Sequence, residues 1–376
     1  MSQITKHAEV KKKIIRFGFL INIQFLILLV LSNFSGKLNP SVWWPISLSG
    51  LVFPVLLLIA IVSGIGWLFI KPKFSIFCLA AIILSIPNIL VSLPLHFSST
   101  HKAKESATLR VVSWNVNLMN YNAKDNKTAI RENEKIFSTL RHLNADVICL
   151  QEFFTAVIPD KTYNFIDSLR NDMGYPFFYF SRDYPKFDGK FFSGTIIFSR
   201  HKITDSSKKL FPFPIPGSII KTSIQYNKDT IDIVSTHLQN INFGRDANMA
   251  LNDSNVGKQE SLSFISKIKY GYTDQVKQVR AIQKVLDSCT HPSIFTGDLN
   301  DVPTSYPYSN IKRKMKDAWL QKGTGLGPTF QFITHTLRID YIFLNDSFEV
   351  KQTSRIISDA SDHYGIVTDL LLLKKD

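Results

Sequence analysis

The sequence predicts a chain of two parts, a helical membrane segment followed by an α/β domain in which helices cover β-sheets. Two observations predict this division. Long runs without any charged residue are confined to the first 100 of the 376 residues, and strand-like apolar runs with two helical patterns follow them. Hydrophobic residues make up 45% of the chain and charged residues 20%, which excludes a disordered or fibrous protein.

The first 100 residues are expected to be a membrane anchor. Asp, Glu, Lys and Arg are absent from residues 17–36, 38–70 and 74–100. Each run can supply the roughly 20 apolar residues with which a helix crosses a bilayer. Trp43 and Trp44 precede the second span as an interfacial aromatic pair. We therefore expect the lipid bilayer as a partner, crossed by three transmembrane helices at about 17–35, 46–70 and 74–96.

The distribution of basic residues predicts the orientation of the anchor. Lysine and arginine favour the cytoplasmic side, and they gather in residues 11–16 and again at Lys71 and Lys73, whereas the intervening loop has Lys37. Three spans then place everything after about residue 100 outside the cytoplasm. The alternative is a cleaved signal peptide over residues 1–35, but no small-residue cleavage site stands out, and the orientation would be the same.

The cysteines favour a bacterial origin. Cys78, Cys149 and Cys289 lie in or beside apolar runs and are expected to be small buried hydrophobes without a disulfide framework. An exported domain without disulfides is typical of a bacterium, so we expect a multi-pass protein of the bacterial inner (plasma) membrane. A transporter or channel is disfavoured, because the uncharged runs carry no ionisable acid or base other than His96.

Residues 101–107 are expected to be a linker, and residues 108–376 a folded domain. Apolar runs bounded by Gly, Asn or Asp predict strands at 109–116, 146–151, 177–180, 194–199, 231–237, 293–296, 339–344 and 366–373. Apolar residues at helical spacing predict helices around 136–143 and over 273–288. The polar segment 240–272 lacks such a pattern and is expected to be a functional or mobile insertion, whose role stays open.

Polar side chains stand at the ends of seven of these predicted strands. The strings are Ser113-Trp114-Asn115, Leu150-Gln151-Glu152, Ser199-Arg200, Thr236-His237, Gly297-Asp298-Leu299-Asn300, Arg338-Ile339-Asp340-Tyr341 and Ser361-Asp362-His363-Tyr364. A buried carboxylate has to be paired, hydrogen-bonded or metal-bound. If the strings converge, they form an oxygen-rich cluster suited to a hard cation such as Mg²⁺ or Mn²⁺.

The ordered set of strings resembles the endonuclease/exonuclease/phosphatase family, which includes deoxyribonuclease-I-like nucleases and lipid phosphodiesterases. The resemblance covers roughly residues 108–373, and its most specific part is Gly-Asp-Leu-Asn at 297–300 followed by Ser-Asp-His at 361–363. It implies a four-layer α/β/β/α sandwich of two mixed sheets. It also implies hydrolysis of a phosphate ester, most often a diester, with bound Mg²⁺ or Mn²⁺.

The resemblance assigns roles to nine positions. Glu152 would be the main metal ligand, with Asn115 beside it and Asp362 completing the acids on the metal side. Asp298 and Asn300 would face the scissile phosphate, where the carboxylate aligns the attacking water or a second metal and the amide donates to a phosphate oxygen. His363, oriented by Asp340, would take the proton of the water. His237 would stabilise or protonate the leaving oxygen, and Arg200 would bind the substrate phosphate.

The chemistry of the residue types supports these roles independently. Phosphodiester hydrolysis needs an aligned water, neutralisation of the non-bridging oxygens and assistance to the leaving alkoxide. Neutral imidazole is the side chain best suited to take a proton near pH 7, and a carboxylate behind it sets the tautomer. A covalent mechanism is disfavoured, because no Ser or Cys lies in a nucleophile-elbow context.

Two departures from the family pattern are visible. Gly365 replaces the proline that often follows Ser-Asp-His-Tyr, which predicts altered loop geometry. The stretch Val116-Asn117-Leu118 lacks the acid that apurinic endonucleases carry there, which puts that repair role in doubt.

The sequence leaves two classes of substrate open. Nucleic acid is favoured by the net charge of +7 after residue 100, and a phospholipid head group is favoured by the membrane tether. A catalytically inactive, membrane-bound binding module is the alternative function, and no obligate protein partner is evident.

Overall fold

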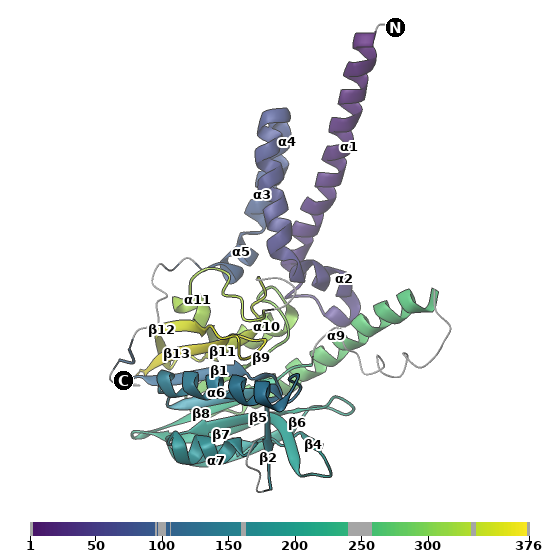
Figure 1. The fold of residues 1–376 in the computed structure, drawn as a ribbon. Helices are drawn as coiled ribbons and strands as arrows, with labels where there is room; N and C mark the ends of the chain where they lie inside the picture. Colours follow the sequence, from purple (N-terminus) through teal and green to yellow (C-terminus); the bar gives the residue numbers. More distant parts are fainter. Residues whose placement is uncertain are drawn as a thin grey trace. The chain divides into compact units, whose positions relative to one another are not determined.

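The computed structural model describes residues 3–94, 96, 103–105, 107–158, 163–239, 258–331 and 336–373. The chain divides into two compact units, one of residues 1–92 with 303–306 and one of residues 93–302 with 307–376 (Figure 1). Much of the expected linker and the first part of the expected insertion, residues 240–257, lie outside the described residues.

The first unit consists of apolar helices. They are α1 (Gln3–Leu31), α2 (Pro40–Leu51), α3 (Phe53–Ile70), α4 (Pro72–Leu84) and α5 (Ile86–Ser92). Two segments, Glu9–Phe34 and Phe53–Ile70, are long and apolar enough to cross a membrane. The polar Asn22 within α1 is buried and paired, since it donates to Ser63 Oγ at 2.8 Å and accepts from Trp67 Nε1 at 3.0 Å. The helices therefore satisfy the polar group that interrupts the first apolar run.

The third expected span is not a single helix. Helices α4 and α5 are bent by 57° at Ser85, so this pair is either one broken span or a re-entrant segment. Pro87 explains the break, because proline lacks the N–H that would continue the helical ladder and its ring clashes with the preceding turn. The second expected span is also shorter than predicted, since α2 ends at Leu51 and Pro54 lies in the first turn of α3.

The second unit contains two mixed sheets, as the sequence analysis expected. The first has the order β12-β13-β1-β2-β5-β3, with β4 paired to β5, and the second has the order β10-β11-β9-β8-β7-β6. The first sheet comprises β1 (Leu109–Asn115), β2 (Val147–Ala156), β3 (Phe177–Phe180), β4 (Tyr184–Lys186), β5 (Phe191–Ser199), β12 (Phe348–Ile356) and β13 (Gly365–Leu372). The second comprises β6 (Ile203–Leu210), β7 (Ser218–Tyr226), β8 (Asp229–His237), β9 (Ser293–Asp298), β10 (Lys316–Asp317) and β11 (Asp340–Leu344).

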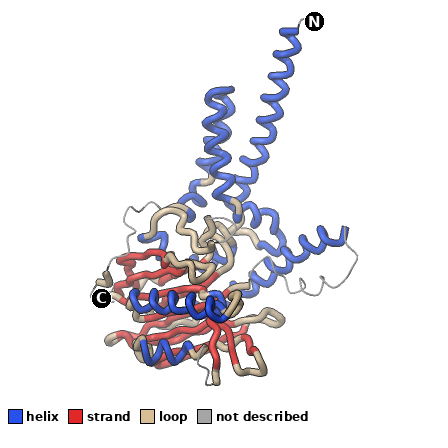
Figure 2. Tube along the Cα trace, in the orientation of Figure 1, coloured by secondary structure: helices blue, strands red, loops and turns tan. Residues whose placement is uncertain are grey.

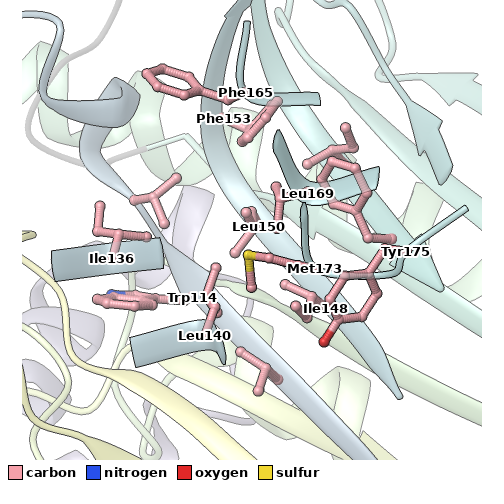
Figure 3. Packing of buried hydrophobic residues seen from close by; sticks show 14 of the residues in the cluster. Trp114, Ile136, Leu140, Ile148, Leu150, Phe153, Phe165, Leu169, Met173 and Tyr175 are labelled. Atoms are coloured by element: carbon pink, nitrogen blue, oxygen red, sulfur yellow. The ribbon is translucent and has the colours of Figure 1, made fainter. Parts of the chain in front are cut away.

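Two apolar cores hold the layers together. Between the sheets, Val111 and Cys149 of the first pack with Ile233 and Ile342 of the second. Alternate residues of the same strands face the other way, and there Trp114, Ile148 and Leu150 pack against α6 (Asn126–Leu143) and α7 (Phe165–Asp167), as Figure 3 shows. The period of two along each strand produces both cores.

Helices lie outside the strand layers of this unit (Figure 2). The longest is α9 (Lys258–Asp287), which buries Val276, Val279 and Ile282 on one stripe. It begins 15 residues before the predicted start at 273, so its first part replaces the expected insertion. Tyr308 of α10 (Tyr306–Lys312) packs on Tyr341 of the second sheet, and the short α11 (Ala318–Lys322) follows β10. The strand expected over residues 177–180 forms β3, but it is half-buried.

Candidate active site

Strand direction brings the polar strand ends to one edge of the sandwich. Strands β1 and β2 run parallel with Asn115 opposite Gln151, and β8 and β9 run parallel with His237 opposite Asp298. Strand β11 runs antiparallel to β9, so its first residue, Asp340, is also opposite Asp298. The carboxyl ends of four strands and the start of β11 therefore meet at the same edge.

Asp298 lies at the centre of this edge and is fully buried. Its Oδ1 accepts from the backbone N–H of Asn300 at 2.8 Å, and its Oδ2 accepts from Asn115 Nδ2 at 3.1 Å. The same Oδ2 lies 3.5 Å from Nε2 of His237 and 3.7 Å from Nε2 of His363. One carboxylate oxygen therefore faces both imidazole rings.

His363 and Asp340 form a buried pair. Nδ1 of His363 donates to Oδ2 of Asp340 at 2.9 Å. Burial raises the pKa of Asp340 to about 6, although the facing imidazole acts against this. Burial favours the neutral His363 ring, but the carboxylates of Asp340 and Asp298 outweigh it and raise the pKa of His363 to about 10. The ring is therefore protonated at neutral pH unless the surrounding negative charge is compensated.

Backbone contacts fix the position of His363. Trp114 Nε1 donates to the carbonyl of His363 at 2.9 Å, and the hydroxyl of Ser361 donates to the carbonyl of Asn115 at 2.8 Å. Gly365 lies directly against Trp114, since a Cβ at this position would be 2.8 Å from Trp114 Cγ. A side chain at this position would therefore require Trp114 to shift.

His237 is oriented by Asn300. The Asn300 amide donates to the carbonyl of Leu238 at 2.8 Å, and its Nδ2 lies 2.9 Å from Nε2 of His237. The Asn300 side chain therefore contacts Nε2 and holds the ring in place. Asn300 adopts this position with a left-handed backbone, at φ +50°. Asparagine adopts this region more readily than other residues with a side chain, because its short polar side chain can hydrogen-bond locally.

Glu152 and Asp362 supply further acids to the same cavity, whose volume is about 340 Å³. Oε1 of Glu152 accepts from Asn115 Nδ2 at 3.0 Å and lies 3.7 Å from His237 Nε2. Glu152 lies at an irregularity in the pairing of β2 with β5 and also has a left-handed φ of +50°. Burial, together with the negative charge of Glu152, raises the pKa of Asp362 although His363 opposes this.

The donor set fits a hard divalent cation. Glu152 and Asp362 line one cavity, and Asn115 donates its amide N–H to Glu152, while its Oδ1 accepts from the backbone N–H of Asn117. Ligand atoms of Asp298, Asp340 and His363 also lie within 4.8 Å of one another. Among the described residues, Oδ1 of Asp340 is buried without a hydrogen-bond partner. Carboxylate oxygens whose mutual repulsion raises a pKa are the environment in which Mg²⁺ or Mn²⁺ is bound.

Arg200 is separated from the other eight predicted site residues. Strand β5 runs antiparallel to β2, so Ser199 is opposite Val147 at the start of β2, far along the strand from Glu152. The Arg200 guanidinium hydrogen-bonds to Asn144 and lies over the Tyr175 ring, 4.9 Å from its centroid. The direction of β5 therefore places Arg200 at the opposite edge, and we withdraw the expectation that it binds the substrate phosphate.

Several residues at the site had no assigned role in the sequence analysis. Trp114 positions His363, and Phe330 lies with its ring 5.1 Å from the His363 ring. Tyr184 of the short edge strand β4 lines the same cavity. Trp114 stood within one of the motif strings and could have been noticed. Tyr184 lies in a stretch without periodicity, so no sequence signal pointed to it.

Two mixed sheets with helices outside and a buried acid–histidine cluster at one edge define the class of fold found in endonucleases, exonucleases and phosphatases. Residues 112–363 match the model of the "Endonuclease/Exonuclease/phosphatase family", and the chain belongs to this family. Residues 12–92 match a second family, described as "Domain of unknown function (DUF8431)". No curated protein matches the chain.

Solved structures share the fold. An endonuclease/exonuclease/phosphatase from Beutenbergia cavernae is 23% identical, with a TM-score of 0.51 over 71% of this chain and 72% of that chain. A humanized TDP2 from D. rerio is 20% identical, with a TM-score of 0.50 over 70% of this chain and 99% of that chain. These likenesses bear on the fold alone.

Proposed function

We propose that the chain is a membrane-tethered phosphodiesterase that hydrolyses a phosphate diester with a bound Mg²⁺ or Mn²⁺. The observation that carries the proposal is the position of Asp298, whose Oδ2 faces Nε2 of both His237 and His363 within 3.7 Å. Two imidazoles on either side of one buried carboxylate can serve the two proton transfers of hydrolysis, one at the attacking water and one at the leaving oxygen.

Each proton transfer has a residue in position. His363, held by Asp340, would accept the proton of the attacking water at Nε2 once the negative charge around it is compensated. Asp298 would orient that water. His237 would assist the leaving oxygen through Nε2, where Asn300 holds its ring.

The cation would bind among the acids that line the cavity. Glu152 and Asp362, with Asn115 beside them, would hold it. When bound, it would neutralise charge on the non-bridging oxygens of the phosphate.

The test is hydrolysis of bis(p-nitrophenyl) phosphate by the full-length protein in detergent. Activity should require Mg²⁺ or Mn²⁺, disappear with EDTA, and fall by at least 10²-fold in His363→Ala. The matched control is His142→Ala, because His142 is exposed on α6 and bonds to its own helix. Undiminished turnover in a Glu152→Gln, His363→Ala double variant would reject the proposal. Calorimetric Mg²⁺ binding without hydrolysis would instead favour the inactive binding module.

We further propose that the domain lies outside the cytoplasm of a bacterium. The basic residues at 11–16 within α1 and at Lys71 and Lys73 favour the cytoplasm. The domain is then outside if the bent pair of α4 and α5 crosses the bilayer, and inside if the pair re-enters on the same side.

A further inference from the structure

A second cavity opens beside the catalytic one. Its volume is about 280 Å³, and it shares Glu152, Tyr184 and His237 with the catalytic cavity. We name it the Tyr184 pocket and define it by Leu118, Asp183, Tyr184, Gly217 and Ser218, which line it. Because the two cavities share Glu152 and His237, a group in the Tyr184 pocket would be joined directly to the phosphate in the catalytic cavity.

The floor of the Tyr184 pocket is polar but neutral. The side chain of Asp183 is 5% exposed and forms an ion pair with Lys208 at 2.9 Å. Its two oxygens also accept hydrogen bonds of 2.7 Å from Ser218 and Ser181. Since the Asp183 carboxylate is compensated and fully engaged, it does not itself attract a cationic group such as a quaternary ammonium.

An accessible aromatic ring forms one wall. Tyr184 remains 39% exposed although it lies between the two cavities. Gly217 has φ +90°, and a Cβ there would be 3.1 Å from the Tyr184 hydroxyl, so glycine leaves room for the ring. An exposed aromatic ring in a cavity that the apolar Leu118 also lines is suited to a flat, uncharged ring.

Size and charge restrict the occupant further. A volume of about 280 Å³ is just below the ~300–1,000 Å³ of sites for drug-sized ligands, which suits one ring system and is small for an acyl chain. Lys186 is the one lysine or arginine among the described lining residues, and Glu152 and Asp183 are acids. A polyphosphorylated head group would therefore find a single cationic partner, Lys186.

We propose that the Tyr184 pocket is a specificity subsite that binds a nucleobase-like ring carried on one arm of the phosphodiester. The ring stacks on Tyr184. This inference rests on the proposed function for the position of the phosphate, and it selects a nucleoside-bearing ester over a lipid head group.

Calorimetric binding to the full-length protein in detergent with Mg²⁺ tests the subsite without requiring turnover. The two probes are thymidine 5′-monophosphate and methyl phosphate, which share a phosphate monoester and differ in the ring. Wild type should bind the nucleotide at least tenfold more tightly, since stacking of one base is of that order. Tyr184→Ala should remove this difference. Tyr184→Phe should keep it, as should the control Tyr270→Ala, an exposed tyrosine of α9.

Equal affinity for the two probes in wild type, or no measurable binding of either, would overturn the inference. So would an unchanged preference in Tyr184→Ala. Phosphocholine or inositol 1-phosphate binding as tightly as the nucleotide would assign the pocket to a lipid head group and reject the nucleobase. Absence of bis(p-nitrophenyl) phosphate hydrolysis with an intact Tyr184-dependent preference would reject the proposed function and leave the subsite standing.

Discussion

Nδ1 of His363 lies 2.9 Å from Oδ2 of Asp340, and both side chains are buried at the edge where the two sheets of the domain meet. The two residues are 23 positions apart in the chain and come from the start of β11 and from the loop before β13. The contact orients the imidazole, so its loss should affect turnover more than binding.

Asp340→Asn should lower kcat by about 10³- to 10⁴-fold, because an amide no longer stabilises the imidazolium and permits the wrong tautomer. The measurement is steady-state hydrolysis of bis(p-nitrophenyl) phosphate. Asp359→Asn is the control, since the Asp359 side chain is 79% exposed on the surface. A kcat within threefold of wild type in Asp340→Asn would mean that the pair does not orient the base.

Mg²⁺ should raise the melting temperature of the domain, and less so in Glu152→Gln. The pKa of Asp362 is raised by burial and by Glu152, so its stability contribution falls as pH rises from about 4 through the higher folded value. A bound cation opposes this loss of stability. It adds about 2.7 kcal/mol to the free energy of unfolding when its concentration is 100 times its Kd. Differential scanning fluorimetry between pH 4 and 7, with and without Mg²⁺, measures the change in melting temperature. If Mg²⁺ raised the melting temperature of Glu152→Gln as much as that of wild type, Glu152 would not be a ligand of the cation.

Asp317→Asn should destabilise the domain by about 3–5 kcal/mol, because it leaves the buried Arg338 guanidinium without its anionic partner. The two groups are 2.7 Å apart, and each side chain is 1% exposed. Asp287→Asn removes an exposed ion pair with Lys314 and should change the free energy of unfolding by at most about 1 kcal/mol. Urea unfolding followed by tryptophan fluorescence compares the two variants, and similar losses would contradict the argument from burial.

Gly365→Ala should destabilise the domain by about 1–3 kcal/mol and lower activity. The added Cβ would be 2.8 Å from Trp114 Cγ, and Trp114 donates to the carbonyl of His363. Thermal unfolding and reporter hydrolysis should therefore change together. Gly189→Ala is the comparison, because no atom lies within 4 Å of the added Cβ there, although its φ of +79° adds backbone strain. If Gly365→Ala lost stability but kept full activity, the hydrogen bond from Trp114 to His363 would not be needed for catalysis.

The number of membrane crossings should decide the side on which the domain lies. Two spans are clear and α4 with α5 is bent by 57°, so an odd number of crossings needs this pair to traverse the bilayer. We expect a C-terminal epitope tag to be degraded by protease added to intact bacterial spheroplasts. A cytoplasmic marker protein should be protected in the same sample. Protection of the tag until the cells are lysed would show that the pair re-enters and that the domain is cytoplasmic.

The sequence alone determined the class of fold and predicted eight of the polar residues that lie together at the candidate site. Apolar runs bounded by Gly, Asn or Asp predicted strands such as β1, β2 and β9, and the motif strings stood at their ends. This worked because a strand buried on both faces is a continuous apolar run, and because parallel neighbours end at the same edge. The same local signal could not show the early start of α9, whose first residues are polar.

Tertiary structure decided the features that depend on strand direction and on packing between distant segments. The antiparallel course of β5 moved Arg200 to the far edge, and the approach of Tyr184 to Gly217 opened a pocket that no motif marks. Hydropathy alone likewise did not decide the number of membrane crossings, because α4 and α5 are bent relative to each other. The local sequence pattern indicates which residues are buried. The positions of Arg200 and Tyr184 and the bend in the helices depend instead on which segments become neighbours, and contacts between residues far apart in the chain decide that.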